Sequence, residues 1–450
     1  MKPATIVLLL GCTATSAAAQ IDPLIAAPPN LVLSNYNGVP VGPYGGLEGT
    51  ASTARVADPS SAWFNPAGLS VAESGQISGS AGAYQRTTVA PLSLSNNIGG
   101  SLQQLPNFVG VSFKVGPKLT LGVAAVTTAS WTQETDSELF IPAGSPQERV
   151  AYSADSEYSQ RVFSLAAGYS GNGAWRVGGG VAFSMTDIRL VQSVGDRIAD
   201  ASGLRTLLVT ARATGSAIQL RTLGGVQYDR GALRTGVVVR TPGATIIRSG
   251  GLTFDGVLDA GVSSLGASLF DADAHYETHL PWEVQGGVAY VRDRVQFEAD
   301  VQGFSSIAPY SMIATGEPIR IYGSAGTGVP PTVLTRPFSG STSASDGVVN
   351  VAVGGNVALT SSRSFRLHGG FGTDYSPVAD ADTIFTHADL YSWTVGASGE
   401  VGKLQFGVGL NHRSGTADDV VLRNLIDRQP VHTPIDISTT GFIYSLAYRF

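Results

Sequence analysis

The chain has 450 residues, a formal net charge of −6 and only 14% charged side chains. A nucleic-acid partner would need a basic stripe, and the sequence has none. Because Cys12 is the only cysteine, an internal disulfide and thiolate-based zinc or iron–sulfur sites are excluded. No apolar run approaches the roughly 18 residues of a membrane helix, and no linker divides the chain into soluble domains.

Residues 1–19 have the pattern of a secretory signal peptide. Lys2 is the positive n-region, residues 6–10 are the centre of a short apolar stretch, and three alanines precede a cleavage site at Gln20. The apolar stretch is too short to span a bilayer as a helix. Alternatively, Leu10-Gly11-Cys12 is a lipoprotein site at which Cys12 would be lipidated.

Residues 20–73 lack the alternation of a strand and include a compact turn. The turn consists of Phe64, Asn65, Pro66, Ala67 and Gly68. Pro66 restricts Asn65 to extended conformations, and Gly68 lets the chain leave in an unusual direction. Asn65 is either an ordinary turn residue or one whose side chain bonds to neighbouring backbone and holds a bistable loop.

An alternating pattern begins near Gly75 and continues to the last residue. Such alternation places successive side chains on opposite faces of a strand. Most of the segments are much longer than the roughly 5–6 residues of soluble strands, and aromatic residues gather near their ends. These features favour a membrane barrel over a soluble antiparallel sandwich, whose strands also alternate. At the C-terminus one face carries Phe442, Tyr444, Leu446, Tyr448 and Phe450.

The pattern predicts fourteen strands with two kinds of connection. The strands span residues 74–86, 107–115, 119–132, 156–170, 174–191, 210–229, 232–249, 276–291, 294–306, 346–360, 364–376, 388–400, 403–413 and 436–450. Tight turns alternate with long connections, at residues 87–106, 133–155, 192–209, 250–275, 307–345, 377–387 and 414–435. Short turns on one side and long loops on the other are typical of outer-membrane barrels.

We therefore predict an all-β fold, a 14-stranded antiparallel transmembrane β-barrel in the bacterial outer membrane. The barrel must close because every backbone N–H and C=O group in hydrocarbon needs an internal partner. The even strand number would place both chain ends in the periplasm. The aromatic C-terminus, with Tyr448 and Phe450, resembles the signal that barrel-assembly machinery recognises. This machinery, outer-membrane lipid and lipopolysaccharide are the expected partners.

A barrel of this width is not filled by its own side chains, as an eight-stranded barrel is. Its lumen would be open to water unless another segment occupied it. We therefore predict that residues 20–73 form a hatch, or plug, inside a barrel of residues 74–450.

The segment GGLEGTASTARVADPSSAWFNPAGLS resembles the N-terminal hatch of the FadL/TodX family of outer-membrane hydrophobic-compound transporters. Weaker similarities lie at residues 239–242, 280–281 and 374–378. The chain departs from the family in a proline-richer start and in a long polar stretch at residues 307–345. The matching hatch positions are Gly45, Gly46, Gly49, Ala54, Ala57, Asp58, Phe64, Asn65, Pro66, Ala67 and Gly68.

The resemblance implies passive uptake of hydrophobic small molecules, such as long-chain fatty acids or aromatic hydrocarbons. The molecule would be captured among the outer loops, enter a pocket above the hatch, and leave sideways into the bilayer through a gap in the wall. The resemblance implies no cofactor, no metal and no covalent chemistry.

Apolar residues in two long connections are candidates for ligand contact; the equal alternative is that they pack the loops into a lid. A carboxylate ligand would be stabilised by a nearby cation, and Arg205 and Arg248 are candidates for that role. The alternative is that these two side chains are solvated or face lipopolysaccharide. The apolar candidates are Leu207, Leu208, Leu252, Phe254, Leu258, Leu269 and Phe270.

Three other functions remain open. A general diffusion porin would have a charged, open lumen, and Glu298 and Asp300 are inward charges of the right kind. An outer-membrane esterase or phospholipase would need a nucleophile with a positioned histidine, but no Gly-x-Ser-x-Gly or His-Glu-x-x-His motif is present. The third is an adhesin or purely structural barrel.

Overall fold

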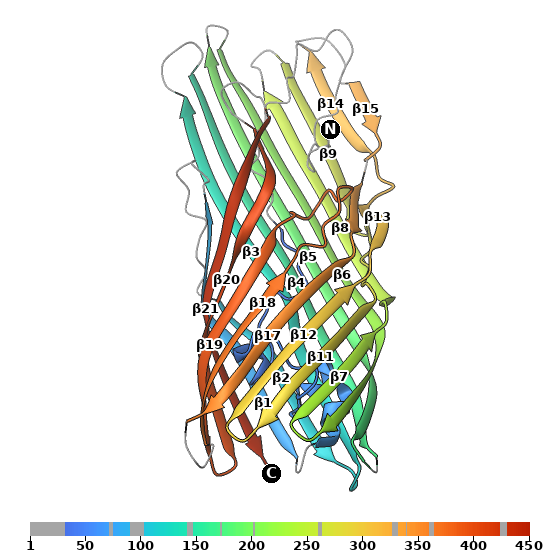
Figure 1. The fold of residues 1–450 in the computed structure, drawn as a ribbon. Coiled ribbons are helices and arrows are strands. Elements are labelled where there is room, and N and C mark those ends of the chain that lie inside the picture. The colour runs from blue at the N-terminus through green and yellow to red at the C-terminus, as the bar shows by residue number, and fades with distance from the viewer. Residues whose placement is uncertain are drawn as a thin grey trace.

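The computed structural model describes residues 32–71, 75–90, 103–141, 147–171, 173–200, 203–259, 263–325, 332–338, 340–359, 364–423 and 430–450. The predicted signal peptide and Cys12 lie outside these ranges. Within them the chain forms a tall barrel of tilted strands (Figure 1). In the described parts, no helix is both long enough and apolar enough to cross a membrane.

The predicted closed barrel with fourteen antiparallel strands is confirmed. Each strand pairs with the next around the ring, and the last strand pairs with the first over residues 76–90 and 436–449. The wall consists of β1 (Gln76–Ala90), β2 (Gln103–Lys114), β3 (Leu119–Ile141), β4 (Gln147–Ser170), β5 (Trp175–Asp200), β6 (Gly203–Arg230), β7 (Leu233–Arg240), β11 (Glu283–Arg292), β12 (Val295–Phe304), β17 (Val348–Ala358), β18 (Phe365–Asp374), β19 (Asp389–Val401), β20 (Leu404–Arg423) and β21 (Pro430–Arg449).

The outward face of the wall is apolar over the part of the barrel that holds the tight turns. On β12, Val295, Phe297 and Val301 are exposed, while Glu298 and Asp300 between them are buried. The C-terminal strand β21 presents the outward row that the sequence predicts. An apolar exterior around a polar interior is the pattern of a barrel that is surrounded by lipid.

Several strands are much longer than the sequence pattern predicts. β3, β4, β5 and β6 contain 23, 24, 26 and 28 residues. They rise well beyond the level of β11, β12, β17 and β18 (Figure 1). The prediction of long loops at residues 133–155, 192–209 and 414–435 is therefore wrong, because most of these residues continue the strands. These outer halves keep a buried inward face, with Val150, Tyr152, Ala154 and Val194 in one apolar cluster, while their outward residues are mainly polar.

Four neighbouring wall positions, those of β7, β11, β12 and β17, are interrupted at mid-height. Above the interruption the wall continues as β8 (Ala244–Asp259), β9 (Ser263–Asp271), β14 (Ile319–Ala325) and β15 (Thr332–Arg336). The chain between the upper and lower parts forms a separate sheet of β10 (His275–Tyr276), β13 (Ile307–Ala314) and β16 (Ser341–Ser345). The predicted strand 276–291 is thus two elements, and the predicted loops 250–275 and 307–345 are largely strand.

This inner sheet fills the middle of the lumen. Tyr276, Met312 and Ile313 are buried in one apolar cluster with Tyr158 of β4 and Ile188 of β5. The ring of Tyr276 lies against Gly215 of β6, where an added Cβ would come within 2.2 Å of it. The inner sheet therefore packs against the inward faces of the strands opposite.

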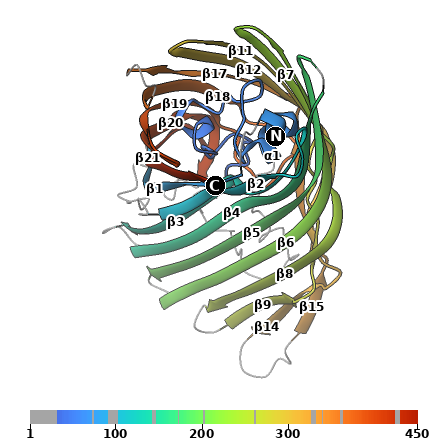
Figure 2. The ribbon, with the colours of Figure 1, turned by 90° about the horizontal axis from the view of Figure 1, so that it is seen from below.

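Residues 32–71, called here the N-terminal segment, lie inside the ring of strands (Figure 2). The segment is irregular apart from a short helix, α1 (Ser61–Phe64), and two 3₁₀ turns, η2 (Gly45–Leu47) and η3 (Pro66–Val71). It contacts inward faces on opposite sides of the barrel, including those of β4, β5 and β19. It occupies the end of the lumen near the tight turns and the C-terminus (Figures 1 and 2).

Candidate functional site

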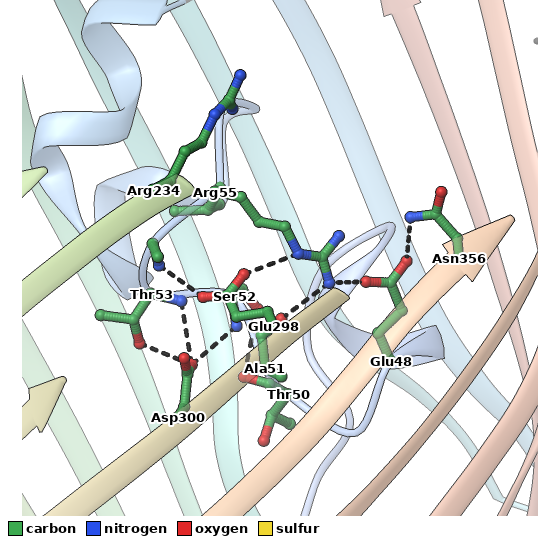
Figure 3. A network of polar contacts seen from close by, with 12 residues as sticks. Glu48, Thr50, Ala51, Ser52, Thr53, Arg55, Arg234, Glu298, Asp300 and Asn356 are labelled. Carbon is green, nitrogen blue, oxygen red and sulfur yellow. Dashed lines mark hydrogen bonds and ion pairs between the residues drawn. The ribbon is translucent and has the colours of Figure 1, made fainter. Parts of the chain in front are cut away.

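A buried ion network joins the N-terminal segment to the wall (Figure 3). Arg55 forms ion pairs with Glu48 of the same segment and with Glu298 of β12, whose Oε2 lies 2.8 Å from Nε. Asn356 of β17 donates a hydrogen bond to Glu48 Oε1 over 2.8 Å, and Nδ1 of His368 on β18 lies 2.6 Å from the same oxygen. Three wall strands thus meet at Glu48 and Arg55.

The wall carboxylates also bind the backbone of the segment (Figure 3). Asp300 Oδ2 accepts hydrogen bonds from the N–H of Ser52 at 2.9 Å and of Thr53 at 3.1 Å, and Glu298 Oε1 accepts one from the N–H of Ala54 at 2.6 Å. Glu298 and Asp300 are inward, as predicted, but they are 0% and 2% exposed. They therefore hold the segment rather than line a water-filled channel.

The side-chain amide of Asn65 holds the turn at residues 64–68 by hydrogen bonds to the preceding loop and to the wall. Asn65 Nδ2 donates to the carbonyl of Thr53 at 2.9 Å and to that of Val226 on β6 at 3.2 Å. Asn65 Oδ1 accepts from the N–H of Ala67 at 3.2 Å. The side chain is completely buried. Asn65 thus connects the turn to the preceding loop and to the wall.

Buried Arg240 of β7 holds the helix before this turn. Its guanidinium pairs with Glu283 of β11 and donates to the carbonyl of Phe64 at 3.2 Å. The guanidinium carbon also lies 4.3 Å from the centroid of the Trp63 ring, within the range of a cation–π contact. Arg240 belongs to residues 239–242, one of the stretches that resemble the family, and it contacts the N-terminal segment directly.

Glycines in the wall give the segment room to approach closely. A Cβ at Gly178 of β5 would lie 2.3 Å from the carbonyl carbon of Pro66, and one at Gly236 of β7 would lie 2.4 Å from the Thr53 oxygen. A Cβ at Gly354 of β17 would lie 2.0 Å from the Glu48 oxygen. The missing side chains form depressions into which the backbone of the segment fits.

The buried carboxyl of Glu48 keeps its charge because of its partners. Burial raises the pKa of Glu48, but Arg55 and His368 outweigh this effect and lower the pKa to about 2. The carboxyl group of Glu48 is thus ionised at neutral pH. Among the described residues, no group of three or more His, Cys, Asp or Glu side chains could hold a metal ion.

A small cavity of about 60 Å³ lies between the N-terminal segment and the inward faces of several wall strands. Its lining includes Trp63, Phe64, Arg221, Leu280 and Pro281. Ligand pockets typically measure about 300–1,000 Å³, so this space is too small for a fatty acid or an aromatic hydrocarbon. Passage of such a molecule therefore requires movement of the surrounding residues.

The candidate ligand residues lie on strands rather than in the predicted loops, and they divide between two faces. Leu252 and Phe254 of β8 and Leu269 of β9 are buried in an inner apolar cluster, with Leu207 of β6 packed against it. Leu258 is half-buried. Leu208 and Phe270 are 52% and 72% exposed, and their strand partners Val257 and Thr253 belong to the outer face.

The two candidate cations are both on strands and are both exposed. Arg205 lies near the outer end of β6. Arg248 lies on β8 and forms an ion pair with Glu277, with 3.8 Å between Nη1 and Oε2. Tyr448 is exposed on the outer face, and the N–H of Phe450 donates to the carbonyl of Gly75 at 2.9 Å. Their role in assembly stays a prediction.

Sequence reasoning did not find the partners that hold the N-terminal segment, namely Glu48, Arg55, Arg240, Glu283 and His368. The three wall residues, Arg240, Glu283 and His368, could have been recognised from their positions in the predicted strands. Each occupies an inward position at the level of the apolar belt, where an ionisable side chain is costly and usually functional.

The fold is similar to those of solved outer-membrane transporters. A FadL homologue of Pseudomonas aeruginosa is 13% identical, with 93% of this chain and 100% of that chain covered and a TM-score of 0.59. The toluene transporter TodX of Pseudomonas putida is 11% identical, covers 92% and 99%, and has a TM-score of 0.57. The toluene transporter TbuX of Ralstonia pickettii is 14% identical, covers 92% and 99%, and has a TM-score of 0.53.

No protein-family model matches the chain, and no curated protein matches its sequence. The likeness therefore rests on the three-dimensional arrangement, which extends over nearly the whole length of each structure compared. By its closed wall, its apolar exterior and this likeness, the chain has the fold of the FadL-type outer-membrane barrels.

Proposed function

We propose that the protein carries hydrophobic small molecules passively across the bacterial outer membrane. The observation that carries this proposal is a membrane barrel whose lumen is filled twice, by the N-terminal segment and by the apolar cluster of the inner sheet. A water-filled pore is a poor path for molecules that water rejects, whereas the apolar cluster of the inner sheet offers them favourable contacts. The structural neighbours are transporters rather than enzymes.

In this proposal the predicted hatch, residues 20–73, closes the lumen to ions and polar solutes. Its described part is held by buried polar contacts from several strands, which suit a segment that must stay in place between transport events. A second apolar cluster, which contains Leu252 and Phe254 of β8 and Leu269 of β9, would be the capture site at the outer end of the barrel. The molecule then passes the inner sheet and leaves sideways into the bilayer.

The diffusion-porin alternative is less compatible with these contacts. Its inward charges, Glu298 and Asp300, are buried against the N-terminal segment. Charges that line a conducting pore would instead be hydrated.

Uptake by whole cells tests the proposal. Cells that lack their own fatty-acid transporter and express this protein should accumulate radiolabelled oleate or toluene faster than cells with an empty vector. A hydrophilic solute such as sucrose serves as the control and should enter at the same rate in both. If neither hydrophobic probe enters faster, or if sucrose enters faster as well, the proposal fails.

A further inference from the structure

Two acidic side chains of one wall strand lie next to each other inside the barrel. Glu298 and Asp300 are two residues apart on β12, so both point into the lumen. The positions that face them on the neighbouring strands carry no charge. These four cross-strand neighbours are all glycine or alanine, namely Gly287, Ala289, Ala352 and Gly354.

The two carboxyl groups border one small space. An added Cβ at Gly287 of β11 would lie 2.2 Å from Asp300 Oδ1 and 3.1 Å from Glu298 Oε1. The two side chains are within hydrogen-bond reach of each other. In the part of the chain that the structure describes, no donor reaches Asp300 Oδ1, although this atom is buried. Ionised carboxylates are acceptors only, so a hydrogen bond between these two groups requires a proton.

The charges that meet at this pair do not balance (Figure 3). Three carboxyl groups come together, because Glu48 of the N-terminal segment lies close to Glu298 and Asp300 of the wall. Arg55 is the cation between Glu48 and Glu298. His368 contacts Glu48 and, even as a cation, would neutralise only one more of the three. At least one negative charge would therefore stay without a counterion if all three carboxyl groups were ionised.

Arg234 of β7 does not supply the missing positive charge. Ala289 of β11 lies between Arg234 and Glu298 in the row across the sheet. Arg234 pairs instead with Asp229, with 3.7 Å between Nε and Oδ1. A buried charge without a counterion is costly, and the group normally takes up a proton instead. Two carboxyl groups in one buried site accordingly share one proton.

A shared proton would leave the contacts to the N-terminal segment in place. The backbone N–H groups of residues 52–54 donate to Asp300 Oδ2 and Glu298 Oε1, not to Asp300 Oδ1. Loss of the proton to water would place two negative charges side by side in a buried site. Their repulsion would turn the side chains apart and pull on the backbone that they hold.

We propose that Glu298 and Asp300 hold one proton between them at neutral pH, and that this proton keeps the N-terminal segment anchored to β12. The pair is thus a proton-binding site that makes the anchor sensitive to pH. The anchor is firm at acidic and neutral pH, and it weakens at alkaline pH when the proton is released to water. This inference does not depend on which molecule the protein carries, or on uptake.

The pH dependence of unfolding tests the proposal. Carboxyl groups of an unfolded chain titrate at about pH 4, so above this pH the folded protein would hold one more proton than the unfolded chain. The unfolding equilibrium constant then rises about tenfold for each pH unit until the pair releases its proton. Asp300→Asn puts an amide N–H in place of the proton and removes this dependence. We expect the ratio of the wild-type constant to that of the variant to rise about tenfold per pH unit from about pH 5 to about pH 7.

The matched control is Asp293→Asn, in the turn between β11 and β12. Asp293 is exposed and pairs with Arg292, with 3.6 Å between Oδ2 and Nε. This change also replaces one carboxyl by an amide, but in contact with water. Its unfolding constant should therefore differ from that of the wild type by the same factor at every pH. All constants are measured by denaturant titration in detergent micelles.

A ratio for Asp300→Asn that does not change with pH would overturn the proposal, because both carboxyl groups would then be ionised in the folded protein. If Asp300→Asn does not fold, Glu298→Gln is measured in the same way, with the same expectation. Infrared spectroscopy gives a second readout. The difference spectrum between the wild type and the folded variant at neutral pH should contain the carbonyl band of a protonated carboxyl group, and its absence would also overturn the proposal. Neither readout requires uptake, so failure of the proposed function leaves this test unaffected.

Discussion

Arg55 holds two carboxylates together in a place that water hardly reaches. Its side chain is 8% exposed, and those of Glu48 and Glu298 are fully buried. Removing ions from water is costly, so such a network adds little net stability compared with an apolar core. The loss of one member is different, because it leaves the remaining charges buried without compensation. Single substitutions here should therefore be severe.

Arg55→Ala leaves Glu48 and Glu298 without their shared cation. We expect it to lower the free energy of unfolding in detergent micelles by about 3–5 kcal/mol, measured by denaturant titration. The matched control is Arg189→Ala on β5, because Arg189 pairs with Asp155 at 3.2 Å on a largely exposed face. The control should cost no more than about 1 kcal/mol. Equal losses in the two variants would contradict a buried anchor.

The charge of Glu48 predicts a pH dependence. Its pKa is about 2 in the folded protein, below its ordinary value of 4.5. Its stabilising effect is therefore complete above about pH 4.5 and is lost as the pH falls towards 2. The difference in unfolding free energy between the wild type and Glu48→Gln should be constant at higher pH and should shrink over this window. A difference that grows on acidification would show that Glu48 is not held as an ion.

At the scale of elements, alternation predicted the strands of the apolar belt because lipid on one side and a filled lumen on the other impose a period of two. It correctly placed Glu298 and Asp300 inward and the row from Phe442 to Phe450 on one face. It did not predict the outer halves of β3 to β6, where the outward face is mainly polar because it meets water rather than lipid, although inward residues such as Val150, Tyr152 and Val194 are buried. It also missed the inner sheet, whose short strands are too irregular to show a period.

The anchoring contacts were not predictable in the same way. Glu48 and His368 are 320 residues apart in the chain, and only closure of the barrel brings them together. The Asn-Pro turn was recognisable because its chemistry is local. Its attachment to Val226 and Thr53 depends on how the whole N-terminal segment sits against the wall.

Adjacent glycines on β5 offer a test of that fit. An added Cβ at inward Gly178 would lie 2.3 Å from backbone of Pro66, which cannot move without shifting the turn. At outward Gly179 the nearest atom would be 3.5 Å away, an ordinary contact. Gly178→Ala should therefore destabilise the protein and expose the N-terminal segment to limited proteolysis.

Gly179→Ala serves as the control for this pair and should resist the protease as the wild type does. Both variants change the strand propensity in the same way, so a difference between them reports on the space next to the turn. Similar proteolysis of both variants would argue against close packing of the turn on β5.

At the scale of the whole molecule, two layers of different chemistry lie inside the barrel. The lower layer is the N-terminal segment, which is held by ions and amides such as Arg55, Asp300 and Asn65. The upper layer is the inner sheet, whose contacts with β3 to β6 are mainly apolar. An apolar molecule can exchange contacts with the upper layer, whereas the lower layer needs specific polar partners. We therefore expect the upper layer to move before the lower layer during transport.

Planar-bilayer conductance of the purified barrel, intact and with residues 21–70 deleted, tests the closed lumen most directly. The structure predicts that the intact protein is nearly silent, because the N-terminal segment fills the lumen, and that the deleted form conducts steadily. Steady ohmic conductance from the intact protein would contradict a closed lumen and would favour a diffusion porin.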